Sequence, residues 1–337
     1  MLIYKTVKDM RNFLLEARDR GNTVGFIPTM GALHAGHISL ISKSKEENNL
    51  TVCSIFVNPT QFNNREDFEK YPISIAEDIN QLEKSGCDLL FLPSVEEVYP
   101  PGLEKKHYNL GYLETILEGQ YRPGHFQGVC QVVDRLLDIV NPNKLYLGRK
   151  DYQQCMVISK LVELVGSRTQ IVICDTVRER DGLAMSSRNA RLNEDQRKQS
   201  LAIFRVLTKL RNALKPGDLN ALKQASAEEL QSQGFRVDYV ELADAGNLRI
   251  LDQWDGHTPV VALVAAYSGQ VRLIDNDIIF PDFYNTLFFL FSLVTCNRYV
   301  QAHFLHSPVY HIHGRRIFPG LVAITSSMTT QEKDEFV

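Results

Sequence analysis

Along the first half of the chain, short uninterrupted apolar runs alternate with longer segments whose apolar residues recur at helical spacing. The runs predict strands at residues 24–27, 51–57, 88–93, 144–147 and 170–175. The intervening segments predict helices at 6–20, after His37, at 74–84, at 127–140 and after residue 151. Uninterrupted apolar strands are typical of a parallel sheet that is buried on both faces. The alternation therefore predicts an α/β fold with a doubly wound parallel sheet.

Polar, turn-forming segments follow the ends of these predicted strands. The first comprises residues 28–37, and the second comprises residues 58–62, with Asn58 and Gln61. In doubly wound sheets, ligands bind beyond the carboxyl ends of the strands. We therefore expect the two segments to share one cleft.

Residues 28–37 combine two glycines with two histidines between a predicted strand and a predicted helix. The glycines allow a tight turn, and the free N–H groups at the start of the helix attract phosphate. His34 and His37 are three residues apart, so both imidazoles lean toward the same side of the first turn. Such a pair can donate hydrogen bonds to a polyphosphate. The alternative is a capped turn with two solvent-exposed histidines.

Two further segments carry phosphate-binding chemistry. Lys150 and Asp151 follow the strand at 144–147, where an ammonium group for phosphate would lie beside a carboxylate for ribose. The loop at 178–189 offers two serine hydroxyls and a guanidinium, which suit a second phosphate clamp. For a single lysine, the alternative is a solvated charge.

The length of 337 residues exceeds the usual ~100–200 residues per domain. We expect a first domain at 1–175, a small α/β domain at 176–281 and an atypical, weakly ordered extension at 282–337. The small domain would contain helices at 193–214 and 219–233 and strands at 236–242 and 260–267. The apolar run at 283–294 is shorter than the ~20 residues that span a bilayer, so no membrane span is expected.

Charge and cysteine usage narrow the function classes. A net charge of −3 argues against a nucleic-acid binder, which needs a basic face. The six cysteines include no C-x-x-C pair and lie mostly in apolar runs, as reduced core residues do. The first residues lack the basic segment and long apolar run of a secretion signal. A cytoplasmic location is expected.

Five segments, in this order, closely resemble the pantothenate synthetase (pantoate–β-alanine ligase) family: PTMGALHAGH, SIFVNPTQF, EGQYRPGHFQGV, LYLGRKDYQQ and DGLAMSSRN. The similarity covers residues 1 to about 279. It implies a Rossmann-like nucleotide- and pantoate-binding domain with a small lid domain, as in related H-x-G-H nucleotidyltransferases. It also implies an ATP-dependent ligase that joins pantoate to β-alanine through an enzyme-bound pantoyl adenylate and releases AMP and pyrophosphate. Mg²⁺, small-molecule substrates and a homodimer belong to the same expectation.

The resemblance also implies which residues form the site. His37, His34, Lys150 and Arg188 would be catalytic. The ATP contacts would come from Met30, Gly31, His34, His37, Gly148, Lys150, Asp151, Val177, Met185, Ser186, Ser187 and Arg188. Pantoate and β-alanine would bind Gln61, Gln154 and Asn58. Glu77 and Asp78 would hold Mg²⁺, and the alternative for this acidic pair is a solvated helix face.

The chain departs from the family pattern in three places. Arg149 stands where the family usually has Glu or Gln, and we expect it to face solvent. Ile73 stands where Arg is common, and residues 282–337 extend beyond the usual end. Two other functions stay open: a related nucleotidyltransferase that keeps the nucleotide in its product, and a catalytically impaired nucleotide-binding protein.

Overall fold

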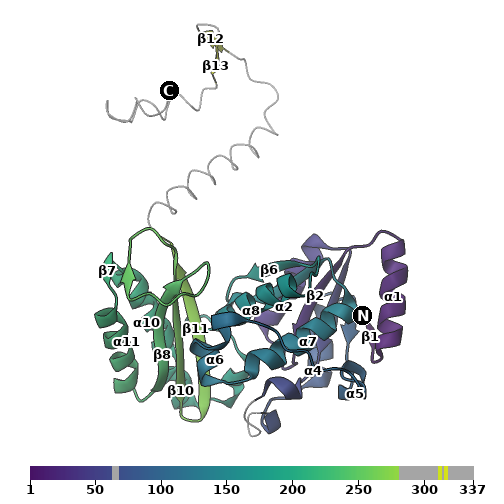
Figure 1. Ribbon diagram of the computed structural model, residues 1–337, viewed down its shortest axis with the longest axis horizontal. Coiled ribbons are helices and arrows are strands. Elements are labelled where there is room, and N and C mark those ends of the chain that lie inside the picture. The colour runs from purple at the N-terminus through teal and green to yellow at the C-terminus, as the bar shows by residue number, and fades with distance from the viewer. Residues whose placement is uncertain (63–67, 281–309, 313–314, 318–337) are drawn as a thin grey trace. The chain divides into compact units, whose positions relative to one another are not determined.

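The computed structural model describes residues 1–62 and 68–280, together with the backbone of 310–312 and 315–317 (Figure 1). Met1–Pro281 form one compact unit, and Asp282–Val337 form a second. The described part of the second unit is an antiparallel pair of strands, β12 (Tyr310–Ile312) and β13 (Arg315–Ile317). The apolar run at 283–294 lies outside the described residues. The boundary expected between residues 175 and 176 stays a prediction.

Six parallel strands form the larger sheet of the first unit, in the order β1-β4-β3-β2-β5-β6. These strands are β1 (Leu2–Tyr4), β2 (Val24–Thr29), β3 (Leu50–Ile55), β4 (Leu89–Phe91), β5 (Lys144–Gly148) and β6 (Gln170–Cys174). The chain adds β3 and β4 on one side of β2, and then β5 and β6 on the other. The direction of winding therefore switches between β2 and β5.

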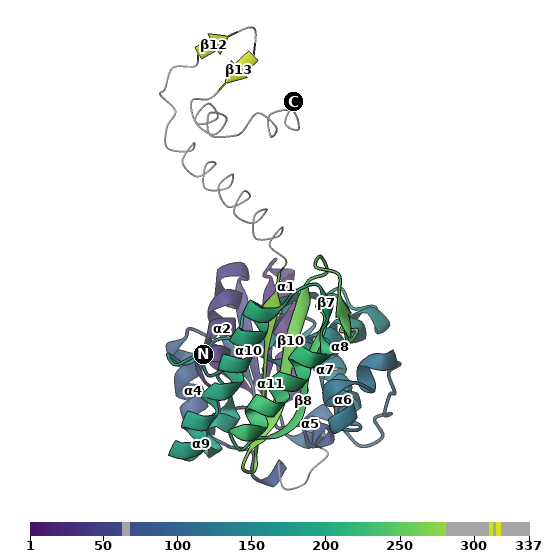
Figure 2. The same cartoon turned by 90° about the vertical axis from the view of Figure 1, so that its left-hand side faces the viewer.

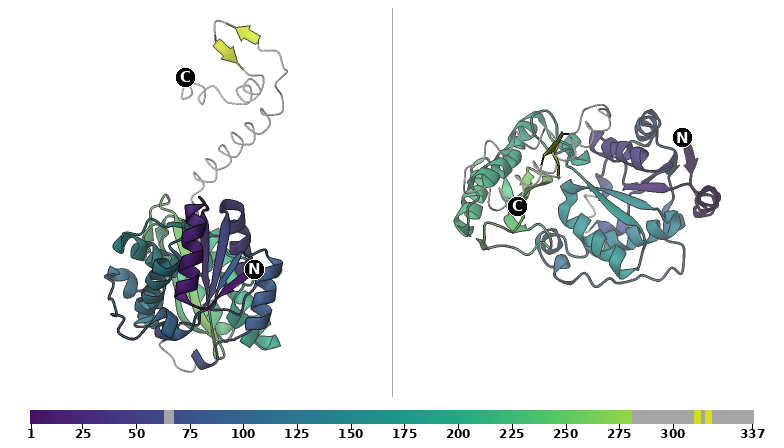
Figure 3. Two further views of the ribbon diagram at one scale, coloured as in Figure 1. Left: turned by 90° about the vertical axis from the view of Figure 1, so that its right-hand side faces the viewer. Right: turned by 90° about the horizontal axis from the view of Figure 1, so that it is seen from above.

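Helices cover both faces of this sheet. The elements that connect the strands are α1 (Val7–Asp19), α2 (Ala35–Glu47), η1 (Pro59–Gln61), α4 (Ile75–Lys84), α5 (Val95–Val98), η2 (Gly111–Glu114), α6 (Leu117–Tyr121), α7 (His125–Val140), η3 (Arg149–Asp151) and α8 (Tyr152–Leu164). α1, in purple, lies against the strands in the left-hand view of Figure 3. In the described residues, no helix is long and apolar enough to cross a membrane.

Alternate residues of the central strands point into two different cores. Phe26, Val52 and Leu145 contribute to the core that contains residues of α1, α7 and α8. Ile27 and Tyr146 contribute to the core on the opposite face, with residues of α2 and α4. Because both faces are buried, the strands are apolar at nearly every position. The predicted doubly wound parallel sheet is confirmed.

A smaller antiparallel sheet follows, in the order β11-β10-β8. The elements of this region are η4 (Ser187–Arg191), α9 (Glu194–Gln199), α10 (Leu201–Ala213), β7 (Gly217–Asp218), α11 (Asn220–Ser232), β8 (Arg236–Asp244), β9 (Gln253–Trp254), β10 (Val260–Ser268) and β11 (Val271–Ile279). α10 and α11 cover one face of this sheet (Figure 2). On the other face, Tyr239 and Leu263 belong to the same core as Phe126 of α7. The two sheets are therefore joined by shared apolar packing.

Two element boundaries differ from the prediction. The single helix expected at 193–214 is wrong, because α9 ends before the buried Ser200 and α10 begins after it. The Ser200 hydroxyl donates to the Gln196 carbonyl at 2.6 Å, a local bond that bends helices. β2 continues to Thr29, beyond the strand predicted at 24–27. Pro28 is tolerated there because β5 pairs with β2 only at Gly25 and Phe26, so no β5 carbonyl requires its missing N–H.

Candidate active site

The reversal of winding between β2 and β5 leaves a cavity of about 250 Å³ at their carboxyl ends. Among its lining residues are most of those predicted from the sequence: Met30, His34, His37, Asn58, Gln61, Gly148, Lys150, Asp151, Gln154, Val177, Met185, Ser186, Ser187 and Arg188. Gly31, Glu77 and Asp78 do not line it. The expectation that the strand-end segments share one cleft therefore agrees with the structure.

His34 and His37 cap the amino end of α2. His34 is the N-cap residue, and its Nδ1 accepts the Gly36 N–H at 3.1 Å. His37 Nδ1 accepts the His34 N–H at 3.3 Å, so two histidines form a reciprocal capping box. The ring centroids lie 4.1 Å apart, as expected for imidazoles on one side of the turn. The interpretation as solvent-exposed histidines is wrong, since both rings are partly buried and line the cavity.

Both histidines are neutral at neutral pH. Burial, followed by the charge of Lys150, lowers the pKa of His34 to about 4. Burial, followed by the neighbouring His34, lowers the pKa of His37 to about 3. Since each Nδ1 accepts a backbone N–H, each neutral ring carries its proton on Nε2. The pair therefore offers two uncharged N–H donors at the start of α2.

Asp78 holds the turn that leads to the histidines. Its carboxylate, on the first turn of α4, is completely buried. It accepts the N–H groups of Ala32 at 2.9 Å and Leu33 at 2.8 Å, and the Ser74 hydroxyl at 3.1 Å. Ala32 has a φ of 49°, a left-handed conformation that is costly for a residue with a side chain. The interpretation of Asp78 as part of a solvated face is wrong, because its bonds stabilise this strained turn.

The turn after β5 places two basic residues in different environments. Lys150 lines the cavity, and its Nζ lies 3.5 Å from an Asp151 carboxylate oxygen. The Arg149 guanidinium pairs with Asp175 at 2.6 Å and does not line the cavity. Arg149 was expected to face solvent, and its side chain is one-third exposed.

A hairpin after β6 carries the predicted phosphate clamp. The Met185 N–H donates to the Val177 carbonyl at 3.0 Å, which closes the hairpin before Ser186. The Ser187 hydroxyl donates to the Ala32 carbonyl at 2.9 Å. This bond joins the clamp directly to the turn that precedes His34.

Uncharged amides also line the cavity. Asn58 is almost fully buried, and its amide donates to the Gln61 side chain and to the Gly128 carbonyl, both at 3.1 Å. Gln61 donates to the Met30 sulfur at 3.0 Å. A side chain on Gly128 would approach the Thr60 carbonyl to 2.2 Å, so only glycine lets α7 come this close to η1.

The sequence reasoning missed several residues that line the cavity. Among the titratable ones are Glu118, His125 and Asp275. Burial opposes ionisation of Glu118, but hydrogen bonds and charge from Arg272 lower its pKa to about 2. Glu118 and His125 belong to the segment EGQYRPGHFQGV, which carries part of the family resemblance, whereas Asp275 and its neighbour Asn276 carried no local signal.

The sequence pattern of a family described as pantoate-beta-alanine ligase matches residues 2–278. The chain belongs to this ligase family. Pantothenate synthetase from Bacteroides thetaiotaomicron is 42% identical over 277 residues, which cover 82% of this chain and 98% of the relative. Pantothenate synthetase from Fervidobacterium nodosum is 41% identical over 286 residues, which cover 83% and 99%. As a member, the chain is an enzyme of the class that forms pantothenate from pantoate and β-alanine.

Solved structures of the ligase family share the fold. The pantothenate synthetase from Thermus thermophilus superimposes with a TM-score of 0.77 at 40% identity, covering 83% of this chain and 100% of that one. The Francisella tularensis pantoate-beta-alanine ligase, complexed with beta-gamma ATP and β-alanine, gives a TM-score of 0.70 at 38% identity. That comparison covers 82% of this chain and 97% of the other.

The acidic pair predicted for Mg²⁺ does not fit a metal centre in this ligase. Both carboxylate oxygens of Asp78 accept backbone N–H groups, and Glu77 is exposed on α4 outside the cavity. Within residues 1–62 and 68–280, no group of three or more His, Cys, Asp or Glu side chains could hold a metal ion.

The stability of the ligase is expected to fall as the pH drops below about 6.5. Burial, followed by the charge of Arg122, lowers the pKa of His125 to about 3, so His34, His37 and His125 are all neutral in the fold. The unfolded chain binds protons on these residues near pH 6.5, which favours unfolding at lower pH. By pH 5, each of these histidines should lower the free energy of unfolding by roughly 2 kcal/mol.

Urea unfolding at pH 7.5 and pH 5.0 measures this loss. In His125→Asn, the free energy of unfolding should differ less between the two pH values, by the contribution of one histidine. His257→Gln replaces an exposed histidine and should show the same difference as the wild type. Equal free energies of unfolding at the two pH values would contradict the conclusion that the three imidazole rings are neutral in the fold.

Proposed function

We propose that the chain condenses (R)-pantoate with β-alanine at the expense of ATP, through an enzyme-bound pantoyl adenylate, and releases AMP and pyrophosphate. The observation that carries this proposal is the pair of neutral histidines at the start of α2, which share one cavity with Lys150 and Ser186–Arg188. Neutral N–H donors and cations that face one cavity suit the transfer of a nucleotidyl group from a polyanion.

In the first step, a pantoate carboxylate oxygen attacks the α-phosphorus of ATP. A new oxygen–phosphorus bond forms, the bond from the α-phosphorus to the bridging oxygen breaks, and pyrophosphate leaves with the electron pair. Charge builds on the α-phosphate and on the leaving group. The Nε2–H groups of His34 and His37 would donate to these oxygens, while Lys150 and Arg188 would offset the charge.

Around the nucleotide, we assign contacts to the remaining cavity residues predicted from the sequence: Met30, Gly148, Asp151, Val177, Met185, Ser186 and Ser187. Gly31 belongs to the adjoining turn. The relative from Francisella tularensis, whose structure is a complex with beta-gamma ATP and β-alanine, supports ATP as the substrate. Mg²⁺, a homodimer and a cytoplasmic location stay predictions.

Asn58, Gln61 and Gln154 would hold pantoate. Amide groups hydrogen-bond hydroxyl and carboxylate groups without neutralising the attacking oxygen. In the second step, the β-alanine amine attacks the carbonyl carbon of the adenylate, an amide bond forms, and AMP leaves after the amine loses a proton. A mixed anhydride hydrolyses in water, so the cavity protects it until the amine arrives.

The test is pyrophosphate release from ATP with pantoate, with and without β-alanine, together with identification of the nucleotide product. Turnover that needs both substrates and yields AMP is the expected result. A product that retains the nucleotide would favour a related nucleotidyltransferase. Absence of pantoate-dependent pyrophosphate release would favour a catalytically impaired nucleotide-binding protein.

A further inference from the structure

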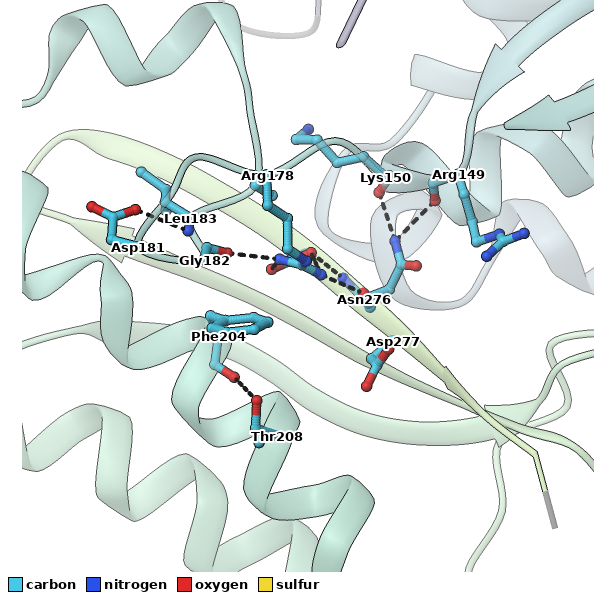
Figure 4. Close-up of polar contacts among 12 residues, drawn as sticks. Arg149, Lys150, Arg178, Asp181, Gly182, Leu183, Phe204, Thr208, Asn276 and Asp277 are labelled. Carbon is cyan, nitrogen blue, oxygen red and sulfur yellow. Dashed lines mark hydrogen bonds and ion pairs between the residues drawn. The ribbon is translucent and has the colours of Figure 1, made fainter. Parts of the chain in front are cut away.

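Two adjacent residues of β11 hold two different segments of the cavity wall. Asp275 and Asn276 are both buried, with exposed fractions of 5% and 3%. Successive side chains of a strand point to opposite faces of a sheet. Asp275 bonds to Arg178, in the hairpin before Ser186. Asn276 bonds to the turn that carries Lys150 (Figure 4).

Asn276 fixes the Lys150 turn through both hydrogens of its amide. Its Nδ2 donates to the Arg149 carbonyl at 3.0 Å and to the Lys150 carbonyl at 2.8 Å. Two bonds to successive carbonyls restrict the rotation of η3 about its own axis. They therefore fix the backbone position from which the Lys150 side chain extends. Because the lysine side chain is flexible, a fixed backbone position matters for where its ammonium group lies.

Arg178 fixes the hairpin to the same strand. Its guanidinium forms two bonds to the Asp275 carboxylate, at 2.6 and 3.0 Å, and donates to the Gly182 carbonyl at 3.1 Å and the Asn276 carbonyl at 3.2 Å. It also lies over the Phe204 ring of α10, at 4.7 Å from the centroid. A side chain on Gly182, whose φ is 97°, would approach the same ring to 2.3 Å, so the hairpin packs closely there.

We propose that Arg178, Asp275 and Asn276 form a latch that sets the spacing between Lys150 and Ser186–Arg188. The latch rests on the proposed function, in which these groups hold the triphosphate of ATP from two sides. Within the latch, Asn276 and Arg178 are positioning residues, since each bonds to the backbone of a segment that carries clamp groups. Electrostatic stabilisation depends on groups placed before the reaction, and a displacement of about 1 Å can cost ~100-fold in rate.

The neighbouring Asp277 provides a matched control on the same strand. Its carboxylate accepts hydrogen bonds from Arg211 of α10, and it does not line the cavity. Asn276→Ala should lower kcat/KM for ATP by roughly 10- to 100-fold in pantoate-dependent pyrophosphate exchange, with the KM for pantoate unchanged. Asp277→Asn should stay within about twofold of the wild type.

A double-mutant cycle with Lys150→Ala distinguishes positioning from general destabilisation. If Asn276 acts through Lys150, adding Asn276→Ala to Lys150→Ala should cause little further loss of activity. An additive loss, or an Asn276→Ala enzyme as active as Asp277→Asn, would overturn the latch. Arg178→Lys, which keeps the charge beside Asp275 but not the fork of donors, tests the same idea should Asn276→Ala fail to fold.

These outcomes separate the latch from the function on which it rests. Exchange by the wild type, with no selective loss in the latch variants, rejects the latch alone. No pantoate-dependent exchange by the wild type rejects the proposed function, and the latch with it.

Discussion

Replacing His37 by asparagine is expected to preserve the start of α2 and to lower the rate of adenylate formation by roughly 100- to 1,000-fold. Asparagine Oδ1 and histidine Nδ1 are both attached to Cγ, so Oδ1 can accept the His34 N–H in place of Nδ1. The substitution removes only the outer part of the ring, with the Nε2–H that faces the nucleotide in the proposed mechanism. The His37→Asn variant therefore separates the structural role of the residue from its catalytic role.

His34→Asn makes the same separation at the N-cap, where asparagine is a preferred residue. Thermal unfolding should place both asparagine variants near the wild type, while His34→Ala should lose about 1 kcal/mol with the cap. Rates come from pantoate-dependent pyrophosphate exchange. Wild-type exchange in His37→Asn would show that the capping bond, and not the Nε2–H group, is what the reaction needs.

The position of the cavity could be predicted because local signals and topology agree. The apolar runs that include Phe26, Val52 and Leu145 are too continuous for strands with a solvated face, and they indicated a parallel sheet. Once the sheet is parallel, the rule for strand ends places His34 and Lys150 at one edge. This placement follows without knowledge of any tertiary contact.

Asp78 could not be predicted in the same way. An acidic residue on the first turn of a helix is favourable on a surface, and its neighbour Glu77 is indeed exposed. Only the packing of α4 beside the turn at 31–33 buries the Asp78 carboxylate and provides its N–H partners. A bond between residues 46 positions apart has no signature in local spacing.

β11 was missed for a related reason. Its polar residues Arg272, Asp275 and Asn276 interrupt the apolar pattern that indicates a strand, although Asp275 and Asn276 are buried. Their partners lie on the Lys150 turn and on the hairpin after β6, so the burial of these polar groups is a property of the assembled fold. Ser200 is comparable, because its side-chain bond to Gln196, at the boundary between α9 and α10, has no signature in the sequence.

Lys150→Ala and Arg149→Ala are expected to differ by at least about 100-fold in kcat/KM for ATP, although the residues are adjacent. Lys150 lines the cavity beside Asp151, whereas the Arg149 side chain does not line it and pairs with Asp175. Removing Lys150 takes away a cation that would face the triphosphate. Removing Arg149 breaks a partly exposed ion pair, which should cost no more than about 1 kcal/mol of stability and leave the rate within about twofold.

The adjacent pair controls for changes in the turn itself, because both alanine variants keep the two backbone carbonyls that accept from Asn276. Initial rates at varied ATP concentration, with pantoate saturating, give kcat and KM for each variant. Similar large losses in both would mean that Arg149 also reaches the nucleotide, so that the charge added at this position contributes to the site. A loss confined to Lys150→Ala would assign the phosphate-binding role of the turn to the lysine and leave Arg149 as a surface partner of Asp175.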